Sequence, residues 1–176
     1  MLDVDTLDRL RTMALTYPAG STLEQPPVGF HRFCRTRQLA RGDFDKAARD
    51  LLGWRVHERA GVQIAASAAQ AQRDEVVLLR IGLGPLALMA PCRVLEVVER
   101  SDRRGFVYGT LQGHPVSGCE RFVIERAADG TLSFTVQAFS RPASRLTRGA
   151  GPFGRLAQSL AAQRYLRALD QLRERR

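Results

Sequence analysis

Cysteine, lysine and long apolar runs are all scarce in this sequence. The three cysteines, Cys34, Cys92 and Cys119, are odd in number and lie far apart with no C-x-x-C spacing, which argues against a zinc site and a dithiol redox motif. We therefore expect free thiols in a reducing compartment and no metal site. The longest uncharged apolar stretch, residues 81–92, contains two glycines and two prolines. It is too short to cross a bilayer, so no transmembrane segment is predicted.

A secretory signal is also lacking. The chain opens with Asp3 and Asp5 where a signal peptide carries basic residues, and no apolar segment follows them. A cytoplasmic protein is the expectation. With 176 residues, 44% of them hydrophobic and 26% charged, the composition is that of an ordinary globular chain. We expect one domain over residues 1–176, large enough to bury about 70% of its unfolded surface.

The positive charge is distributed unevenly. The net charge is +9, and residues 141–176 hold nine arginines against Asp170 and Glu174. Such a basic terminus makes an anion-surface or nucleic-acid adaptor one alternative function. However, Lys46 is the sole lysine among the 27 basic residues, so codon bias from a GC-rich genome also explains the arginine content. No aromatic residues for base stacking are interleaved with these arginines, since Tyr165 belongs to an apolar stripe, and no specific nucleic-acid partner is expected.

Helical periodicity marks three segments. An N-terminal helix is predicted within residues 1–16 with Asp3 as its N-cap, and a short helix within residues 43–53 begins at Asp43 and ends at Gly53. A long C-terminal helix is predicted over residues 153–173, where an apolar stripe continues for about five turns. This stripe consists of Phe153, Leu156, Ala157, Leu160, Ala161, Tyr165, Ala168, Leu169 and Leu172.

Alternating apolar and polar residues predict a sheet between residues 30 and 140. Strands are expected at residues 30–39, 54–64, 75–81, 86–99, 105–111, 120–125 and 132–139. Short turns between most of them indicate an antiparallel meander. In the last strand the alternation is complete, so one face must be covered, and the C-terminal helix is the candidate cover. The predicted class is α+β.

Several motifs carry a resemblance to a known family. They are Tyr17-Pro18, Leu52-Gly53-Trp54, Ala90-Pro91-Cys92-Arg93-Val94, Tyr108-Gly109-Thr110-Leu111-Gln112-Gly113-His114-Pro115-Val116-Ser117-Gly118-Cys119-Glu120, Ala138-Phe139-Ser140-Arg141-Pro142 and Arg164-Tyr165. With these residues the chain resembles the domain-of-unknown-function family nineteen-ninety of bacteria and plants, which has no established activity. The general shape of that family is similar to the helix-grip superfamily of polyketide cyclases, lipid-transfer domains and plant allergens. The resemblance implies a curved antiparallel sheet that grips a long C-terminal helix.

The same superfamily holds apolar ligands between its sheet and its long helix. Our preferred hypothesis is therefore a non-catalytic or weakly catalytic module that binds a small apolar or amphipathic ligand in such a cavity. The expected ligand-binding residues are Tyr108, Gly113, His114, Ser117, Arg93 and Arg141. Family members more often carry a second acid where this chain has Cys119, which counts against a role that needs paired carboxylates. The sequence does not indicate an oligomeric state.

The densest set of reactive side chains follows Gly113. An imidazole such as that of His114 can titrate near neutrality and the Glu120 carboxylate could orient it, so an enzyme that uses His114 and Glu120 as an acid/base pair is the alternative function. In the simpler interpretation Gly113 and Pro115 shape a turn, and His114 and Ser117 bond its backbone.

Two further patterns are not expected to form a cofactor or metal site. Residues 82–87 match G-x-G-x-x-A, but a strand rather than a helix is predicted after them, so no dinucleotide cofactor is expected. His31 and His57 lack metal-ligand spacing and are expected at the surface or in turns. Trp54 is expected to anchor the short helix to the sheet.

Overall fold

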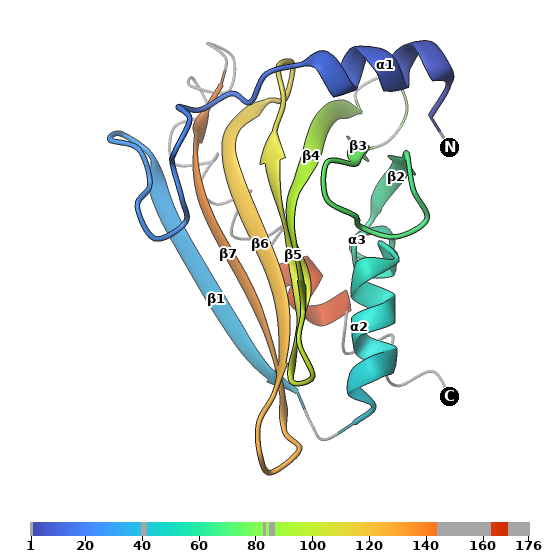
Figure 1. Ribbon diagram of the computed structural model, residues 1–176, viewed down its shortest axis with the longest axis vertical. Coiled ribbons are helices and arrows are strands. Elements are labelled where there is room, and N and C mark those ends of the chain that lie inside the picture. The colour runs from blue at the N-terminus through green and yellow to red at the C-terminus, as the bar shows by residue number, and fades with distance from the viewer. Residues whose placement is uncertain (1, 40–41, 83, 85–86, 144–162, 169–176) are drawn as a thin grey trace.

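The computed structural model describes residues 2–39, 42–82, 84, 87–143 and 163–168. A seven-stranded antiparallel sheet dominates it, with the strand order β1-β7-β6-β5-β4-β3-β2 (Figure 1). The predicted antiparallel meander is confirmed for β2 to β7, and β1 returns beside β7. The strands are β1 (His31–Leu39), β2 (Val62–Ala66), β3 (Val76–Ile81), β4 (Leu88–Glu99), β5 (Arg103–Thr110), β6 (Val116–Arg126) and β7 (Leu132–Pro142).

Two helices connect the opposite edges of the sheet. Because β1 and β2 are the edge strands, the chain between them must cross one face, and α2 (Phe44–Leu52) and α3 (Arg55–Arg59) make that crossing (Figure 1). The Asp43 carboxylate caps α2 by accepting a hydrogen bond from the Lys46 amide at 2.8 Å, as predicted. Phe44, Ala47 and Leu51 form the buried side of α2. The cap and the apolar stripe together explain why this helix forms where it does.

We call the sheet surface beneath these helices the inner face. Its core also includes the helical segment 163–168, through Tyr165, Leu166 and Ala168. The rest of the predicted C-terminal helix, over residues 153–173, lies outside the described residues. The strand residues buried on the inner face include Val94, Phe106, Tyr108, Phe122, Ile124, Phe134 and Val136.

The opposite surface of the sheet, the outer face, has a smaller core. Tyr17 and Leu23 pack there against Val107, Cys119 and Phe139. The Tyr17 ring meets the Phe139 ring edge-on, with 5.1 Å between their centroids. The chain between α1 and β1 therefore covers the outer face as a loop.

The N-terminal helix α1 (Val4–Thr12) begins as predicted and ends earlier. Asp3 accepts a hydrogen bond from the Thr6 amide at 2.8 Å, which confirms the N-cap. The prediction extended the helix toward residue 16, but Leu15 forms an antiparallel bridge with Leu111. Pairing with the sheet thus replaces the last helical turn.

The strand predicted at residues 54–64 is wrong in its first half, which forms α3. Trp54 has a left-handed backbone with a φ of 66°, and its carbonyl accepts hydrogen bonds from the amides of His57 and Glu58. Val56 and His57 are adjacent in sequence and both are fully buried. A half-buried strand would place neighbouring side chains on opposite faces, whereas two consecutive helical residues can both face a core. His57 is accordingly buried, and its expected place at the surface or in a turn is also wrong.

After the glycine-containing segment at residues 82–87, the next strand is β4, which begins at Leu88. In the described part of the chain, no helix combines the length and the apolar character needed to cross a bilayer.

Candidate functional site

A tyrosine–glutamate pair lies on the inner face of the sheet. Tyr108 in β5 and Glu120 in β6 are cross-strand partners, and the Tyr108 hydroxyl donates a hydrogen bond to Glu120 Oε2 at 2.8 Å. Both point inward because they alternate with Val107 and Cys119, which belong to the outer core. The pair introduces a carboxyl group into a wall that is otherwise largely aromatic and aliphatic.

Burial controls the ionisation of this pair. It raises the pKa of Glu120 to about 7, while the hydrogen bond from Tyr108 acts in the opposite direction. The pKa of Tyr108 is well above its ordinary value, first because of burial and then because of the neighbouring Glu120 charge. The glutamate can therefore change its protonation state near neutral pH, and the tyrosine remains a hydrogen-bond donor.

A buried histidine stands beside the pair. The ring centroid of His57 lies 4.7 Å from that of Phe122, 4.8 Å from that of Tyr165 and 6.2 Å from that of Tyr108. Neither ring nitrogen of His57 has a hydrogen-bond partner among the described residues, and the same holds for Trp54 Nε1. Burial lowers the pKa of His57 to about 3, so the imidazole is neutral. We call Trp54, His57, Tyr108, Glu120 and Tyr165 the inner polar cluster.

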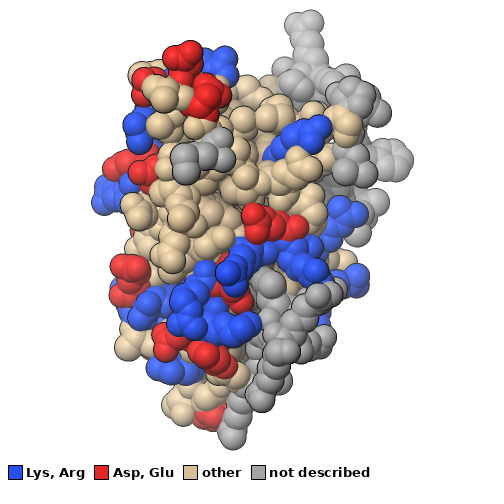
Figure 2. All heavy atoms as spheres, turned by 90° about the vertical axis from the view of Figure 1, so that its right-hand side faces the viewer, with Lys and Arg blue, Asp and Glu red and all other residues tan. Residues whose placement is uncertain are grey.

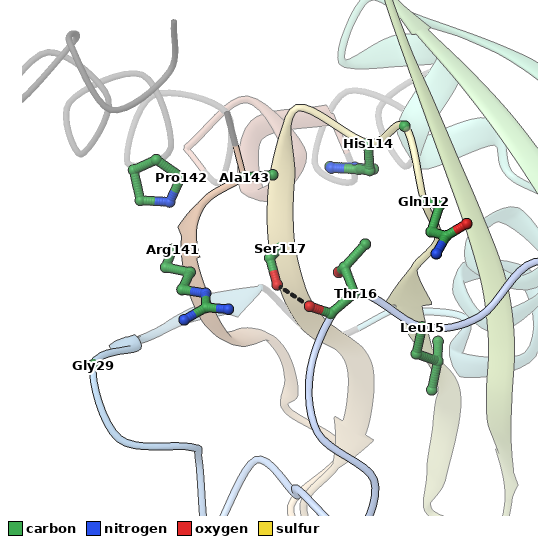
Figure 3. Close-up of a pocket in the computed structure, with 10 residues that line it drawn as sticks. Leu15, Thr16, Gly29, Gln112, His114, Ser117, Arg141, Pro142 and Ala143 are labelled. Atoms are coloured by element: carbon green, nitrogen blue, oxygen red, sulfur yellow. Dashed lines mark hydrogen bonds between the residues drawn. The ribbon is translucent and has the colours of Figure 1, made fainter. Parts of the chain in front are cut away.

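A pocket of about 750 Å³ opens at one end of the outer face (Figure 3). Ser117 in β6 and Arg141 in β7 are cross-strand partners there. The Ser117 hydroxyl donates to the Thr16 carbonyl at 2.8 Å and so ties the covering loop to the sheet. The described residues that line this outer pocket are Leu15, Thr16, Gly29, Gln112, Gly113, His114, Ser117, Arg141, Pro142 and Ala143.

The turn before β6 sets the orientation of His114. Gly113 has a φ of +90°, a backbone conformation that glycine adopts at little cost. His114 Nδ1 accepts a hydrogen bond from the Val116 amide at 2.9 Å, which places the proton of the neutral ring on Nε2. Burial lowers the pKa of His114 to about 4. His114 thus bonds the backbone of its own turn and also lines the pocket.

The residues expected to form one site occupy two sides of the sheet. Gly113, His114, Ser117 and Arg141 gather at the outer pocket, whereas Tyr108 and Glu120 face the inner core. His114 and Glu120 therefore do not face a common space. An acid/base pair made of these two side chains has no support in this arrangement.

Arg93 lies at a third place. Its Nη2 donates to the carbonyl oxygens of Leu10, Arg11 and Met13 at 3.1, 2.7 and 2.8 Å. These carbonyls end α1 and have few intrahelical partners, and a cation there also complements the helix dipole. Arg93 thereby attaches α1 to β4.

Replacing Arg93 with methionine is expected to loosen α1. The variant keeps an aliphatic stem but loses three carbonyl contacts, and we expect about 1–2 kcal/mol of lost stability. Limited trypsin digestion should then cut faster after Arg9 and Arg11, as followed by mass spectrometry. Arg104→Met, which removes a comparable bond to the Arg100 carbonyl, is the control. Equal protection of α1 in both variants would contradict this role of Arg93.

Three members of the inner polar cluster were not expected as site residues. Trp54 was predicted only as an anchor of the short helix. His57 was missed because its segment was predicted to be a strand with His57 on the polar side. Tyr165 was predicted only as part of an apolar stripe. No local signal distinguished His57, because an apolar Val56 followed by a polar His57 also fits the alternation of a strand.

The surface charge of α2 and α3 is relevant to the alternative function as an anion-surface or nucleic-acid adaptor. Figure 2 shows basic and acidic side chains side by side on this face. Lys46 and Arg55 both pair with Asp50, at 3.4 and 3.0 Å. On segment 163–168, Arg164 and Arg167 are exposed. The charges described here are those of a mixed solvated surface, and most of the basic C-terminus lies outside the described residues.

In the described residues, no three His, Cys, Asp or Glu side chains come together in a way that could hold a metal ion.

Solved structures with a similar fold cover most of the chain. A hypothetical protein of Helicobacter pylori matches with a TM-score of 0.67 and 11% identity, covering 92% of this chain and 96% of its own. Ara h 8.0201 matches at 0.58 and 11%, covering 81% and 97%. A major latex-like protein of Panax ginseng matches at 0.55 and 12%, covering 82% and 98%. Ara h 8 and the latex-like protein have the helix-grip fold, and at these identities the likeness concerns fold alone.

Sequence relatives identify the family. A UPF0548 protein of Deinococcus radiodurans is 43% identical over 105 residues, which are 56% of this chain and 53% of that protein. A UPF0548 protein of Arabidopsis thaliana is 39% identical over 77 residues, 40% of this chain and 38% of that protein. The matches thus span about half of these relatives or less. Residues 16–168 match the family described as a domain of unknown function, DUF1990, and the chain therefore belongs to the DUF1990 family.

Proposed function

We propose that this protein binds a small amphipathic ligand against the inner face of its sheet, with the polar group of the ligand at Tyr108 and Glu120. The observation that carries the proposal is the inner polar cluster. Buried polar groups are nearly always hydrogen-bonded in native proteins, because an unpaired buried donor or acceptor costs about 1–3 kcal/mol. Trp54 and His57 together leave three such atoms without a partner among the described residues.

A bound polar group would satisfy these atoms. The Tyr108–Glu120 bond uses one carboxylate oxygen of Glu120, and a carboxyl group has further acceptor capacity at both oxygens. With a pKa of about 7, Glu120 can accept from a ligand when ionised and donate to one when protonated. The neutral His57 offers one donor and one acceptor on the same side of the sheet.

The surroundings of the cluster favour a ligand with a planar or apolar body. Phe106 and Phe122 stack with 5.4 Å between ring centroids, and Tyr165 meets Phe122 edge-on at 5.2 Å. Aromatic walls with a few convergent polar groups are typical of small-molecule sites. The helix-grip neighbours have the same sheet architecture, which supports the choice of the inner face.

The cluster is tightly packed, and this has a consequence for uptake. His57 is fully buried, and Trp54 and Tyr108 are almost so. A ligand can reach them only if the helical layer moves away from the sheet. The proposal therefore implies slow uptake that accelerates with temperature, as expected for local opening of a packed core.

The test is the small-molecule content of freshly purified protein, measured by native mass spectrometry and by solvent extraction. We expect a retained amphipathic molecule, and we expect Glu120→Gln to reduce its occupancy about tenfold, since loss of one charge-assisted hydrogen bond costs on the order of 1.4 kcal/mol or more. The amide oxygen of the introduced glutamine could still accept the Tyr108 bond, so folding should be preserved.

Arg121→Gln is the matched control. Arg121 is the next residue of β6 but faces outward, where it pairs with Glu24 at 2.8 Å. Its replacement should leave ligand occupancy unchanged. The proposal fails if the wild-type protein neither carries a molecule nor takes up medium-chain fatty acids or aromatic carboxylic acids added as probes.

A further inference from the structure

The outer pocket has an arrangement of donors that the inner-face proposal does not use. Arg141 is exposed and lines the pocket, and its guanidinium carbon lies 4.6 Å from the centre of the Phe30 ring. Stacking on a ring face leaves the edge N–H groups of a guanidinium free. The described residues offer Arg141 no carboxylate partner within 4 Å. A cation is thus held in place by an aromatic ring, and no carboxylate of the described residues pairs with it.

The packing of Phe30 against the outer core holds the Arg141 guanidinium in position. Phe30 packs edge-on against Phe139, with 5.5 Å between ring centroids, and Phe139 is almost fully buried in the outer core. Core packing therefore orients the Phe30 ring, and the ring orients Arg141. A pre-organised cation loses less entropy on binding an anion than a free surface arginine does.

A second donor lies across the pocket. Figure 3 shows the His114 ring and the Arg141 guanidinium on either side of Ser117. Because His114 Nδ1 accepts from the Val116 amide, its other nitrogen, Nε2, carries the hydrogen of the neutral ring. Gln112 adds a side-chain amide to the lining. No aspartate or glutamate is among the described residues that line the pocket.

The pocket is larger than a single ion requires. Its volume of about 750 Å³ falls within the range of roughly 300–1,000 Å³ that is usual for small-molecule sites. Leu15, Pro142 and Ala143 contribute apolar surface beside the donors. The space accommodates an organic body as well as an anionic group.

We infer that the outer pocket is a second binding site, which takes a small organic anion whose carboxylate or phosphate group meets Arg141 and His114. This inference does not depend on the inner-face ligand, since the two sites lie on opposite faces of the sheet. Carboxylate and phosphate share the recognition chemistry, because a guanidinium binds either through two parallel N–H groups. Because the two groups differ in charge, comparing the affinities of a carboxylate probe and a phosphate probe distinguishes them.

The test uses four probes of similar size: phenyl phosphate, benzoate, benzamide and benzyl alcohol. Binding is followed by the amide resonances of Gly29, Gly113 and Ser117 in ¹H–¹⁵N spectra of the whole chain. We expect saturable shifts at these residues with phenyl phosphate or benzoate and none with the two neutral probes. The anion with the higher affinity identifies the class of group that the pocket takes.

Two arginine variants distinguish binding at the outer pocket from a general attraction of anions to positive charge. Arg141→Gln should lower the affinity for the better anion at least tenfold. Arg126→Gln should change it less than twofold, because Arg126 is also exposed and stacked, 5.0 Å from the centre of the Phe44 ring, but lies at the other end of β6.

Three results would overturn the inference. They are neutral probes binding as well as anions, an equal loss in both arginine variants, and the absence of saturable shifts at the pocket with either anion. The spectrum of each variant reports its folding directly, so a misfolded protein cannot be mistaken for a loss of the site.

Discussion

Gly118→Ala is expected to destabilise the protein by about 3 kcal/mol or more, the upper range for overpacking in a rigid site. A Cβ atom at this position would lie 2.1 Å from the Phe139 carbonyl oxygen and 2.9 Å from the Ser140 Cα. Both atoms belong to the backbone of β7, which is paired with β6 at this point. Relief of the overlap would require the neighbouring strands β6 and β7 to separate.

Two hydrogen bonds between the Thr110 side chain and the Gly118 backbone increase the expected loss of stability. Thr110 Oγ1 accepts a hydrogen bond from the Gly118 amide at 2.8 Å and donates one to the Gly118 carbonyl at 3.0 Å. A shift of β6 would break both bonds in a buried environment. The effect is to be measured by urea unfolding.

Gly130→Ala is the control for this prediction. Gly130 lies in the turn before β7 with a φ of +82°, and apart from Gly130 and its two chain neighbours no described residue comes within 4 Å of its hypothetical Cβ. Only the left-handed backbone opposes alanine there, at a cost of about 1 kcal/mol. If Gly118→Ala were no worse than Gly130→Ala, the close approach of β6 to β7 would be wrong.

Replacing His57 with leucine is expected to stabilise the ligand-free protein, by about 1 kcal/mol at pH 7. The buried imidazole has two nitrogens without partners among the described residues, and an apolar side chain of similar volume removes that penalty. Leucine also suits the short helix α3, since it is a good helix former.

The gain should grow as the pH falls. The pKa of His57 is about 3 in the folded state and about 6.5 in an unfolded chain. The folded state therefore resists protonation, and the stability associated with neutral His57 is present above pH 6.5 and is lost as the pH falls toward 3. Between pH 6.5 and pH 4 each unit of pH adds about 1.4 kcal/mol to the advantage of the leucine variant, which should therefore rise from about 1 kcal/mol at pH 7 to about 4 kcal/mol at pH 4.

The contribution of His57 is obtained from the difference in stability between the His57→Leu variant and the wild type at each pH. Glu120 has a raised pKa of about 7, so its contribution to stability is lost as the pH rises from 4.5 through 7, opposite in sign to that of His57. His114 has a lowered pKa of about 4 and acts in the same direction as His57. Subtracting the wild-type curve from the variant curve leaves the His57 contribution.

His31→Leu is the control for the His57 prediction, because His31 is exposed on the edge strand β1. It should change stability by less than about 0.5 kcal/mol. A His57→Leu variant whose stability advantage does not increase between pH 7 and pH 4 would show that His57 is hydrogen-bonded or solvated. If the inner face binds ligand as proposed, the same variant should also retain less of it.

Local signals were sufficient for much of the fold. Asp3 and Asp43 were recognisable as N-caps because a short acidic side chain before an apolar helical stripe satisfies free backbone amides. The alternation in β7 was recognisable because a sheet with two different faces imposes a period of two. These features depend on residues within a few positions of one another.

The division of the site into two faces depended on strand pairing. The sequence placed the start of a strand near Glu120, but β6 begins at Val116 because residues 116–119 pair with the end of β7. Once the strand is extended, Ser117 and Glu120 differ by an odd number of positions and must face opposite sides. A motif that looked like one constellation thus contributes to an outer pocket and to an inner polar cluster.

By itself, the sequence determined the α+β class, the antiparallel sheet, two helix starts and the family, because each follows from local periodicity, capping or a contiguous motif. Only the tertiary structure decided that the segment after Trp54 is helical, that His57 is buried without partners among the described residues, and that His114 and Glu120 are apart. These outcomes arise from contacts between residues far apart in the chain, such as His57 with Phe122 and Leu15 with Leu111. Packing energy from such contacts outweighs the differences of about 1 kcal/mol or less in local preference that a pattern can detect.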